Sequence, residues 1–221
     1  MKILLVADNE ESALWGKWSE DMADKITDVD LVLSAGDLSA YYLEYLADNI
    51  NAPVVFVPGN HDSGYVQRPP KRCINTDDRI TEISITEDSE INHLRIFGIG
   101  GSMRYKDGAY QYTEEEQAFR VRKLMRDKKS IRANGNRCID IVLTHAPCRD
   151  YGDMQDVPHR GFECFNEFLY ELKPKLHCYG HIHEEYYSIS PTVREVGFQR
   201  VIKHPSGTNL INGSGFCFII V

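Results

Sequence analysis

The chain has 221 residues and an ordinary apolar content, which suits one folded domain with a sizeable core rather than a disordered or fibrous protein. Its formal net charge is −8, so the overall field repels polyanions. We therefore expect no binding to long nucleic acid or to an anionic membrane surface, and no apolar stretch is long enough to cross a bilayer.

The first half of the chain alternates predicted strands and helices. Lys2–Ala7 is a short apolar run typical of a buried strand, and apolar residues at helical spacing then predict a helix over Ser12–Ile26. Leu31–Leu33 and Val54–Val57 are two further strands, and between them Ser39 is placed to cap a second helix. This alternation predicts a mostly parallel sheet with helices on its faces.

The rest of the chain is predicted to add more strands and two helices. Thr113 and Glu116 form a capping box that opens a charged helix running to about Lys128. Aromatic residues between Phe162 and Leu172 mark an amphipathic helix and are expected in the core. Further strands are predicted at Thr81–Ile85, Leu94–Ile99, Cys138–Leu143, Leu176–Tyr179, Val193–Val196, Gln199–Ile202, Asn209–Ile211 and Phe216–Val221, the last four as antiparallel strands.

The use of cysteine and the form of the N-terminus predict a cytoplasmic location. Six cysteines occur without any C-x-x-C pair, which disfavours zinc ribbons and redox dithiols and makes a reducing compartment the default. The apolar run Ile3–Ala7 is too short for the core of a secretory signal. Since no linker or repeat divides the sequence, residues 1–221 are predicted to form a single domain.

Metal-competent residues follow five of the predicted strands. They are Asp8 with Glu10; Asp37; Asn60, His61 and Asp62; His145; and His181 with His183. Taken singly, such an Asp is usually a turn residue and such a His a structural one. Gathered at one edge of one sheet, carboxylates and imidazoles are costly unless a cation neutralises them. The pattern therefore predicts a metal site.

Four segments of this set form an ordered series. They are Gly36-Asp37, Gly59-Asn60-His61-Asp62, Thr144-His145 and Gly180-His181-Ile182-His183. In this order, and preceded by the strand-end Asp8, they resemble the calcineurin-like metallophosphoesterases. The resemblance implies an α/β fold in which a two-sheet β-sandwich is flanked by helices, in four αββα layers. It also implies a hydrolase that acts on phosphate esters.

The resemblance further implies two divalent metal ions, with Asp37 bridging them. One ion would be held by Asp8, Asp37 and His183, and the other by Asp37, Asn60, His145 and His181. Mixed nitrogen and oxygen ligands suit several metals, of which we expect Mn first, with Fe, Zn, Ni or Mg as alternatives. Gly36, Gly59 and Gly180 are expected where the backbone passes close to the site.

The chemistry implied by the resemblance is attack of a metal-activated hydroxide on a phosphodiester or a phosphomonoester, with no covalent intermediate. His61 would act on the leaving group as a general acid or a cation, and Asp62 would orient its imidazole. Arg104, Tyr105 and Arg160 are predicted contacts to a small phosphate-ester substrate, although each arginine has a solvated or ion-paired role as the alternative. The sequence does not select between monoester and diester, and it leaves the oligomeric state open.

One position departs from the family pattern. The family usually carries Asp-x-His after the first strand, whereas this chain reads Asp8-Asn9-Glu10. Glu10 either coordinates through oxygen, which would favour Mn or Mg, or is a loop carboxylate that leaves the first site with one ligand fewer. We predict coordination.

Two other classes of function were weighed against the enzyme. The retromer scaffold subunit resembles this fold and works through protein contacts, so a protein-binding scaffold with little activity is the main alternative. His61 argues against it, because a scaffold has no need of this residue. A serine hydrolase is disfavoured because no G-x-S-x-G motif is present, and Gly213-Ser214-Gly215 is explained by a tight turn.

Overall fold

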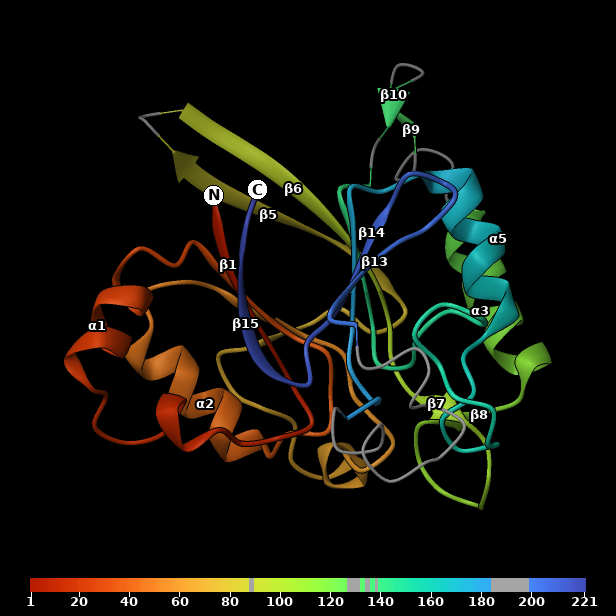
Figure 1. The fold of residues 1–221 in the computed structure, drawn as a ribbon, viewed down its shortest axis with the longest axis horizontal. Coiled ribbons are helices and arrows are strands. Elements are labelled where there is room, and N and C mark those ends of the chain that lie inside the picture. Colours follow the sequence, from red (N-terminus) through yellow and green to blue (C-terminus); the bar gives the residue numbers. More distant parts are fainter. Residues whose placement is uncertain (88–89, 127–131, 134–135, 138, 184–198) are drawn as a thin grey trace.

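The chain folds into four layers in the order helix, sheet, sheet, helix, as the computed structural model in Figure 1 shows. The structure describes residues 1–87, 90–126, 132–133, 136–137, 139–183 and 199–221. Helices α1 and α2 lie on the outer side of one sheet, and α3 and α5 lie on the outer side of the other. The predicted α/β sandwich is confirmed.

The first sheet has the strand order β15-β1-β2-β3-β4. Its strands are β1 (Lys2–Ala7), β2 (Leu31–Ser34), β3 (Val54–Phe56), β4 (Ile74–Asn75) and β15 (Gly215–Ile220). Strands β1 to β4 are parallel, and β15 pairs antiparallel with β1. The mostly parallel sheet expected from the start of the chain is therefore present, and α2 (Ala40–Asn49) begins at its predicted cap, because the Ser39 hydroxyl accepts a hydrogen bond from Tyr42 N.

The first predicted helix is shorter than expected. Ser12–Leu14 forms a 3₁₀ turn, η1, and the helix α1 spans only Glu20–Thr27. Gly16 has a φ of 85°, which interrupts helical geometry. The Ser19 hydroxyl then accepts a hydrogen bond from the N–H three residues further on and starts α1 afresh. The prediction of a continuous helix was wrong because local capping outweighed the apolar spacing.

The second sheet has the order β13-β14-β12-β11-β6-β5. Its strands are β5 (Arg79–Glu87), β6 (Glu90–Ile99), β11 (Ile141–Thr144), β12 (Leu176–Tyr179), β13 (Val201–Lys203) and β14 (Asn209–Asn212). Its four central strands are parallel, and its two edge strands pair antiparallel with their neighbours. The predicted antiparallel pairing at the end of the chain is confirmed for β13 with β14 and for β15 with β1, but β14 also pairs in parallel with β12. The predicted strand Val193–Val196 falls outside the described residues, as does Cys138, the first residue of the predicted strand that contains β11.

The remaining elements lie outside the two main sheets. They are η2 (Ser63–Val66), β7 (Ser102–Met103), β8 (Gln111–Tyr112), α3 (Glu114–Met125), β9 (Arg132–Ala133), β10 (Asn136–Arg137) and α5 (Glu163–Leu172). The capping box of Thr113 and Glu116 is formed as predicted. Phe165 and Phe168 of α5 pack on the second sheet and are core residues, as expected.

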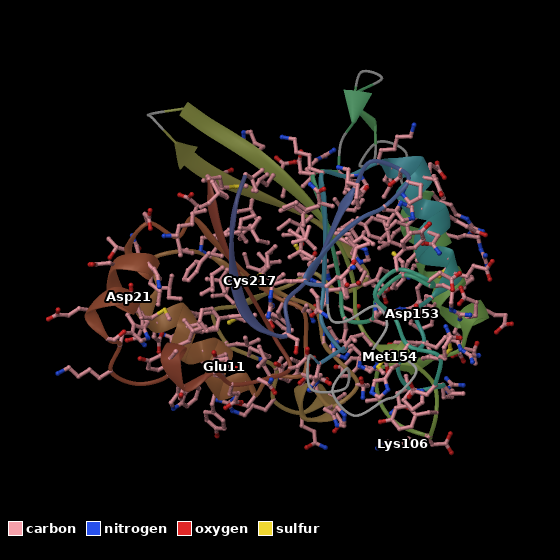
Figure 2. The ribbon with its side chains drawn as sticks, viewed as in Figure 1. Glu11, Asp21, Lys106, Asp153, Met154 and Cys217 are labelled. Atoms are coloured by element: carbon pink, nitrogen blue, oxygen red, sulfur yellow. The ribbon has the colours of Figure 1, made fainter. Side chains whose placement is uncertain are left out.

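The two sheets share one apolar core. Leu5 and Leu33 of the first sheet pack with Ile96, Ile141 and Leu143 of the second, and all are buried. Strand side chains alternate between faces, so the neighbouring residues in the same strands contact the outer helices instead. Figure 2 shows the side chains between the sheets, with the partly buried Cys217 of β15 among them. This burial on both faces explains why the strands read as continuous apolar runs.

Within the described part of the chain, no helix combines the length and the hydropathy of a membrane span.

Candidate metal centre

The loops that follow β1, β2, β3 and β12 meet around one cavity of about 180 Å³. Its lining consists of Asp8, Asp37, Asn60, His61, Tyr105, Pro158, His159, His181 and His183. His145, which follows β11, is fully buried beside this lining, and its Nε2 lies 3.0 Å from Asn60 Oδ1. Side chains from five distant stretches of sequence are therefore brought together. They follow strands of both sheets, whereas the sequence predicted one edge of one sheet, so that part of the prediction was wrong.

Three of the candidate ligands occupy strained backbone positions. The φ angle is 66° at Asp8, 59° at Asp37 and 71° at His181. Residues other than glycine rarely adopt this left-handed region, and each such position costs on the order of 1–3 kcal/mol. The sharp turns let the chain leave the end of its strand while the side chain stays at the cavity. This strain falls on the very residues that the sequence predicts as ligands.

Glycine is required where these turns touch one another. A Cβ on Gly59 would collide with the Asp37 carboxylate, and a Cβ on Gly180 would lie 2.6 Å from Ala7 Cβ. Real Cβ atoms do not approach so closely, so any larger residue would push the ligand loops apart. The expectation that backbone passes close to the site at these glycines is confirmed.

Asp37 lies at the centre of the site. Its Oδ1 accepts a hydrogen bond of 2.8 Å from His61 N, and its Oδ2 is 3.4 Å from His145 Nε2. The ligand atoms of Asp37, His145 and His181 all lie within 4.8 Å of one another. A carboxylate that faces ligands on more than one side is suited to the bridging role implied by the family resemblance.

Asp62 joins two of the ligand loops. Its Oδ2 accepts hydrogen bonds from Gly59 N at 2.7 Å and from Asp37 N at 2.8 Å. Burial, together with the negative charge of Asp37, raises the pKa of Asp62 to about 7. The observed contacts fix the loop after β2 against the loop after β3. Orientation of the His61 imidazole by Asp62 stays a prediction.

Charge in the buried half of the site is balanced between Asp37 and His145. Burial by itself would raise the pKa of Asp37, but the nearby imidazole of His145 outweighs it and holds the pKa well below its usual range. Burial would likewise lower the pKa of His145, yet the charge of Asp37 raises it to about 9. Each value shows that the carboxylate is stabilised by adjacent positive charge, which a divalent cation also supplies.

The hydrogen bonds of the two buried histidines define which nitrogen can bind a metal. His145 Nδ1 donates to Ala35 O at 2.7 Å, and His181 Nε2 donates to Pro158 O at 2.7 Å, because a carbonyl oxygen can only accept. The opposite ring nitrogens are left as candidate ligand atoms. Burial and the neighbouring His145 lower the pKa of His181 to about 3, so its imidazole is in the neutral form that metals bind.

The donor set therefore fits a divalent metal. In the neutral tautomer, His145 Nε2 presents a lone pair to Asn60 Oδ1 at 3.0 Å and to Asp37 Oδ2 at 3.4 Å. Three lone-pair donors that face one another in a buried site need a proton or a cation between them. The Asp8 side chain is also fully buried, and its Oδ1 lies 3.9 Å from His183 Nε2.

The structure does not bring all the predicted residues to the cavity. Glu10 is exposed and absent from the lining, and its Oε1 accepts a hydrogen bond of 2.9 Å from Ser39 N at the start of α2. Its predicted coordination stays a prediction. Arg104 forms an ion pair with Glu116 at 2.7 Å, and Arg160 donates to a carbonyl of its own loop, Gln155 O, at 2.9 Å.

Tyr105 is the predicted substrate contact that does reach the cavity. Its hydroxyl lies 3.5 Å from Asn60 Nδ2, which places the phenol beside a candidate metal ligand.

His159 also lines the cavity. The sequence named it, with Arg149 and Arg160, as one of the cations after His145 that could hold a phosphate, but did not choose it among the predicted contacts. Its ring lies 5.3 Å from the ring of His181, and its Nδ1 lies 2.6 Å from Asp156 Oδ2. The loop that carries it is closed by Asp153, labelled in Figure 2, whose carboxylate accepts a hydrogen bond from Gly161 N at 3.0 Å.

Comparison with known proteins agrees with this geometry. A family model described as calcineurin-like phosphoesterase matches residues 1–185, which include every candidate ligand. The chain belongs to the calcineurin-like phosphoesterase family. Membership supports metal-dependent hydrolysis of phosphoesters as the general class of activity.

Individual relatives of this phosphoesterase are distant. It is 23% identical to UPF0046 protein T07D4.2 of Caenorhabditis elegans, over 73% of this chain and 48% of that protein, so the chain spans about half the length of that relative. A crystal structure of TT1561 from Thermus thermophilus is similar with a TM-score of 0.57 and 14% identity, over 97% of this chain and 89% of the other. Another solved structure gives a TM-score of 0.59 with 12% identity, over 99% and 94% of the two chains. At these identities the solved structures support the fold alone.

Proposed function

We propose that this calcineurin-like phosphoesterase hydrolyses a small phosphate ester at a centre of two divalent metal ions. The observation that carries the proposal is the buried group of lone-pair donors formed by Asp37, Asn60 and His145, with the neutral imidazole of His181 within reach. Such a group is costly to bury unless a proton or a cation completes it. A purely structural role offers no reason to assemble it at the floor of a cavity.

The proposed ligands divide on the two sides of Asp37. His145, Asn60 and His181 would hold one ion, while Asp8 and His183 would hold the other, with Asp37 shared. Two divalent ions bound there would activate water and stabilise the charge on the phosphoryl oxygens. We propose Mn as the preferred metal, because both oxygen and nitrogen donors are present.

The residues around the ligands define the rest of the proposed mechanism. His61 is exposed at the cavity and donates its backbone N–H to Asp37, so its imidazole would lie beside a bound phosphoryl group. From there it would protonate or stabilise the leaving-group oxygen, a role worth about 10²–10⁴-fold in rate. Tyr105 and His159 line the same cavity and would contact the phosphoryl oxygens.

The proposed substrate is a small ester, and the proposed location is the cytoplasm. The net charge of −8 opposes the approach of long nucleic acids. The five cysteines in the described ranges are free, which fits a reducing compartment.

The test is hydrolysis of bis(4-nitrophenyl) phosphate and of 4-nitrophenyl phosphate by chelator-treated protein, with and without added Mn²⁺, Mg²⁺, Zn²⁺ or Ni²⁺. We expect activity with Mn²⁺ that is lost on chelation, more than about 100-fold lower activity in Asp37→Asn, and about 100-fold lower activity in His61→Ala. Asp24→Asn, on the exposed face of α1, is the matched control and should behave as wild type.

Equal rates in the wild type, Asp37→Asn and His61→Ala would rule the assignment out. Metal binding without hydrolysis of either ester would favour the protein-binding scaffold instead.

A further inference from the structure

The metal cavity is too small to enclose a whole substrate. Its volume is about 180 Å³, whereas ligand pockets commonly measure roughly 300–1,000 Å³. The cavity therefore accommodates a phosphoryl group and leaves the remainder of the substrate to lie outside it. The surface next to the cavity therefore determines which esters can bind.

A second hollow of about 370 Å³ lies next to the cavity. Asp37 and His61 line both spaces, so the two adjoin at the residue that would act on the leaving group. The further walls of this second hollow, here called the leaving-group groove, include Leu38, Ala40, Tyr41, Gly64, Tyr65 and Arg68. Most of these walls are apolar.

The groove presents an aromatic ring that is fixed in place. Tyr41, near the start of α2, is 64% exposed. The guanidinium carbon of Arg68 lies 3.9 Å from the centre of its ring, and Arg68 is in turn held by Glu44 at 2.8 Å. The ion pair and the stacked guanidinium restrain the ring, while much of the Tyr41 side chain stays open to a ligand.

The charges around the groove favour a neutral occupant. Glu44 neutralises Arg68, and Asp62 lies in the same wall. A leaving group with a further phosphate would meet the carboxylates of Asp37 and Asp62, while the charge of Arg68 is shared with Glu44. A neutral planar ring, in contrast, can stack on Tyr41 and cover the apolar wall formed by Leu38 and Ala40.

We propose that the leaving-group groove binds a neutral planar aromatic group, so that the preferred substrates are phosphate esters of aromatic alcohols or of nucleosides. This inference rests on the proposed function. In the reaction, the oxygen of a water molecule bonds to phosphorus and the P–O bond to the alcohol breaks. The leaving oxygen takes up the proton that the water loses. The resulting alcohol departs past His61 into the groove, where Tyr41 is the stacking partner.

The kinetic test compares phenyl phosphate and adenosine 5′-monophosphate with 2,2,2-trifluoroethyl phosphate, an alkyl ester without a ring. Tyr41→Ala should lower kcat/KM for the two aromatic esters by about 10-fold, mainly through KM, because each stacked base contributes roughly this much. The rate for the alkyl ester should stay within about 2-fold. Tyr41→Phe keeps the ring and should match the wild type. Tyr170→Ala, which removes an exposed tyrosine of α5, is the control.

A binding test separates this inference from the proposed function. Saturation-transfer NMR on the protein as purified would use phenol, adenosine and ribose as probes, none of which is a phosphate ester. We expect transfer to the rings of phenol and adenosine in the wild type and Tyr41→Phe, and its loss in Tyr41→Ala. Transfer to adenosine alone would restrict the occupant to a nucleoside.

The outcomes are distinct. One result is saturation transfer to the rings that depends on Tyr41 in a protein that hydrolyses no ester. That result would support binding in the leaving-group groove and overturn the proposed function. Hydrolysis that is equally fast for aromatic and alkyl esters in wild type and Tyr41→Ala, with unchanged NMR signals, would overturn the groove and leave the proposed function standing.

Discussion

The two sides of Asp37 are built differently. On one side, His145 is fully buried, and its ring is fixed by a hydrogen bond to Ala35 O. On the other, the His183 side chain is 24% exposed and lies 3.9 Å from Asp8. A buried ligand whose ring is fixed by a hydrogen bond is preorganised and shielded from water, whereas a partly exposed imidazole competes with water for the metal. The difference predicts a tight ion on the buried side and a weaker one at the rim.

The largest effect is expected from His145→Ala. Loss of this imidazole removes a ligand of the tight ion and leaves the Asp37 carboxylate without its buried partner. We expect hydrolysis of bis(4-nitrophenyl) phosphate to fall by more than about 100-fold and to stay low at every Mn²⁺ concentration. Recovery at millimolar Mn²⁺ would show that the buried side is not the tighter one.

A smaller effect is expected from His183→Ala. The rim ion should bind more weakly, so activity at low Mn²⁺ should drop by about 10–100-fold and should return as Mn²⁺ is raised. The check is a Mn²⁺ titration of the rate in both histidine variants. The comparison of the two sides fails if His183→Ala is the variant that cannot be rescued.

Much of the buried side could be predicted from the sequence. Asp37, Asn60, His145 and His181 each follow a short apolar run. Parallel strands bring the first two to one edge of the first sheet and the last two to one edge of the second, but the sequence did not predict that two sheets share the site. Gly59 was also predictable, because close approach of loops excludes any side chain. The spacing of the apolar residues and the positions of the polar residues that follow them can be read directly from the sequence.

The rest depends on contacts between residues far apart in sequence. Asp62 accepts the N–H of Asp37, and Glu10 accepts the N–H of Ser39, 29 residues away. The hydrogen-bond donors to these two carboxylates cannot be predicted from the neighbouring sequence, since a carboxylate in a loop has several donors within reach. His159 could be named as a nearby cation but not placed in the cavity, because the course of its loop is set by side-chain hydrogen bonds to the backbone.

The buried imidazole of His177 gives a prediction on how the stability of the fold depends on pH. Burial, with a lesser contribution from His204, lowers the pKa of His177 from 6.5 to about 3, and its Nε2 lies 2.7 Å from Thr144 Oγ1 beside His145. Between these pH values the unfolded chain binds a proton that the folded chain does not, so the free energy of unfolding falls as pH is lowered.

We expect the His177→Gln variant to lose this part of the acid sensitivity. The difference in slope should be at most about 1.4 kcal/mol per pH unit between pH 6.5 and about 4, measured by urea unfolding. His93→Gln, which alters an exposed histidine, is the control and should keep the wild-type slope. Identical slopes in all three proteins would contradict the buried neutral state of His177.

The smallest effect is expected from Glu10→Gln. Glutamine keeps an oxygen that can accept the N–H of Ser39 but removes the carboxylate charge. If the role of Glu10 is to hold the start of α2, metal content and activity should stay within about 2-fold of wild type. Loss of one metal ion per chain, measured by elemental analysis, would instead establish Glu10 as a ligand of the rim ion.

The most direct test of the metal centre is anomalous diffraction from crystals soaked in Mn²⁺. We expect two anomalous peaks roughly 3.5–4 Å apart on either side of Asp37, with the higher Mn²⁺ occupancy on the side of His145. Ordered crystals that show no anomalous peak among these side chains at saturating Mn²⁺ would contradict this expectation.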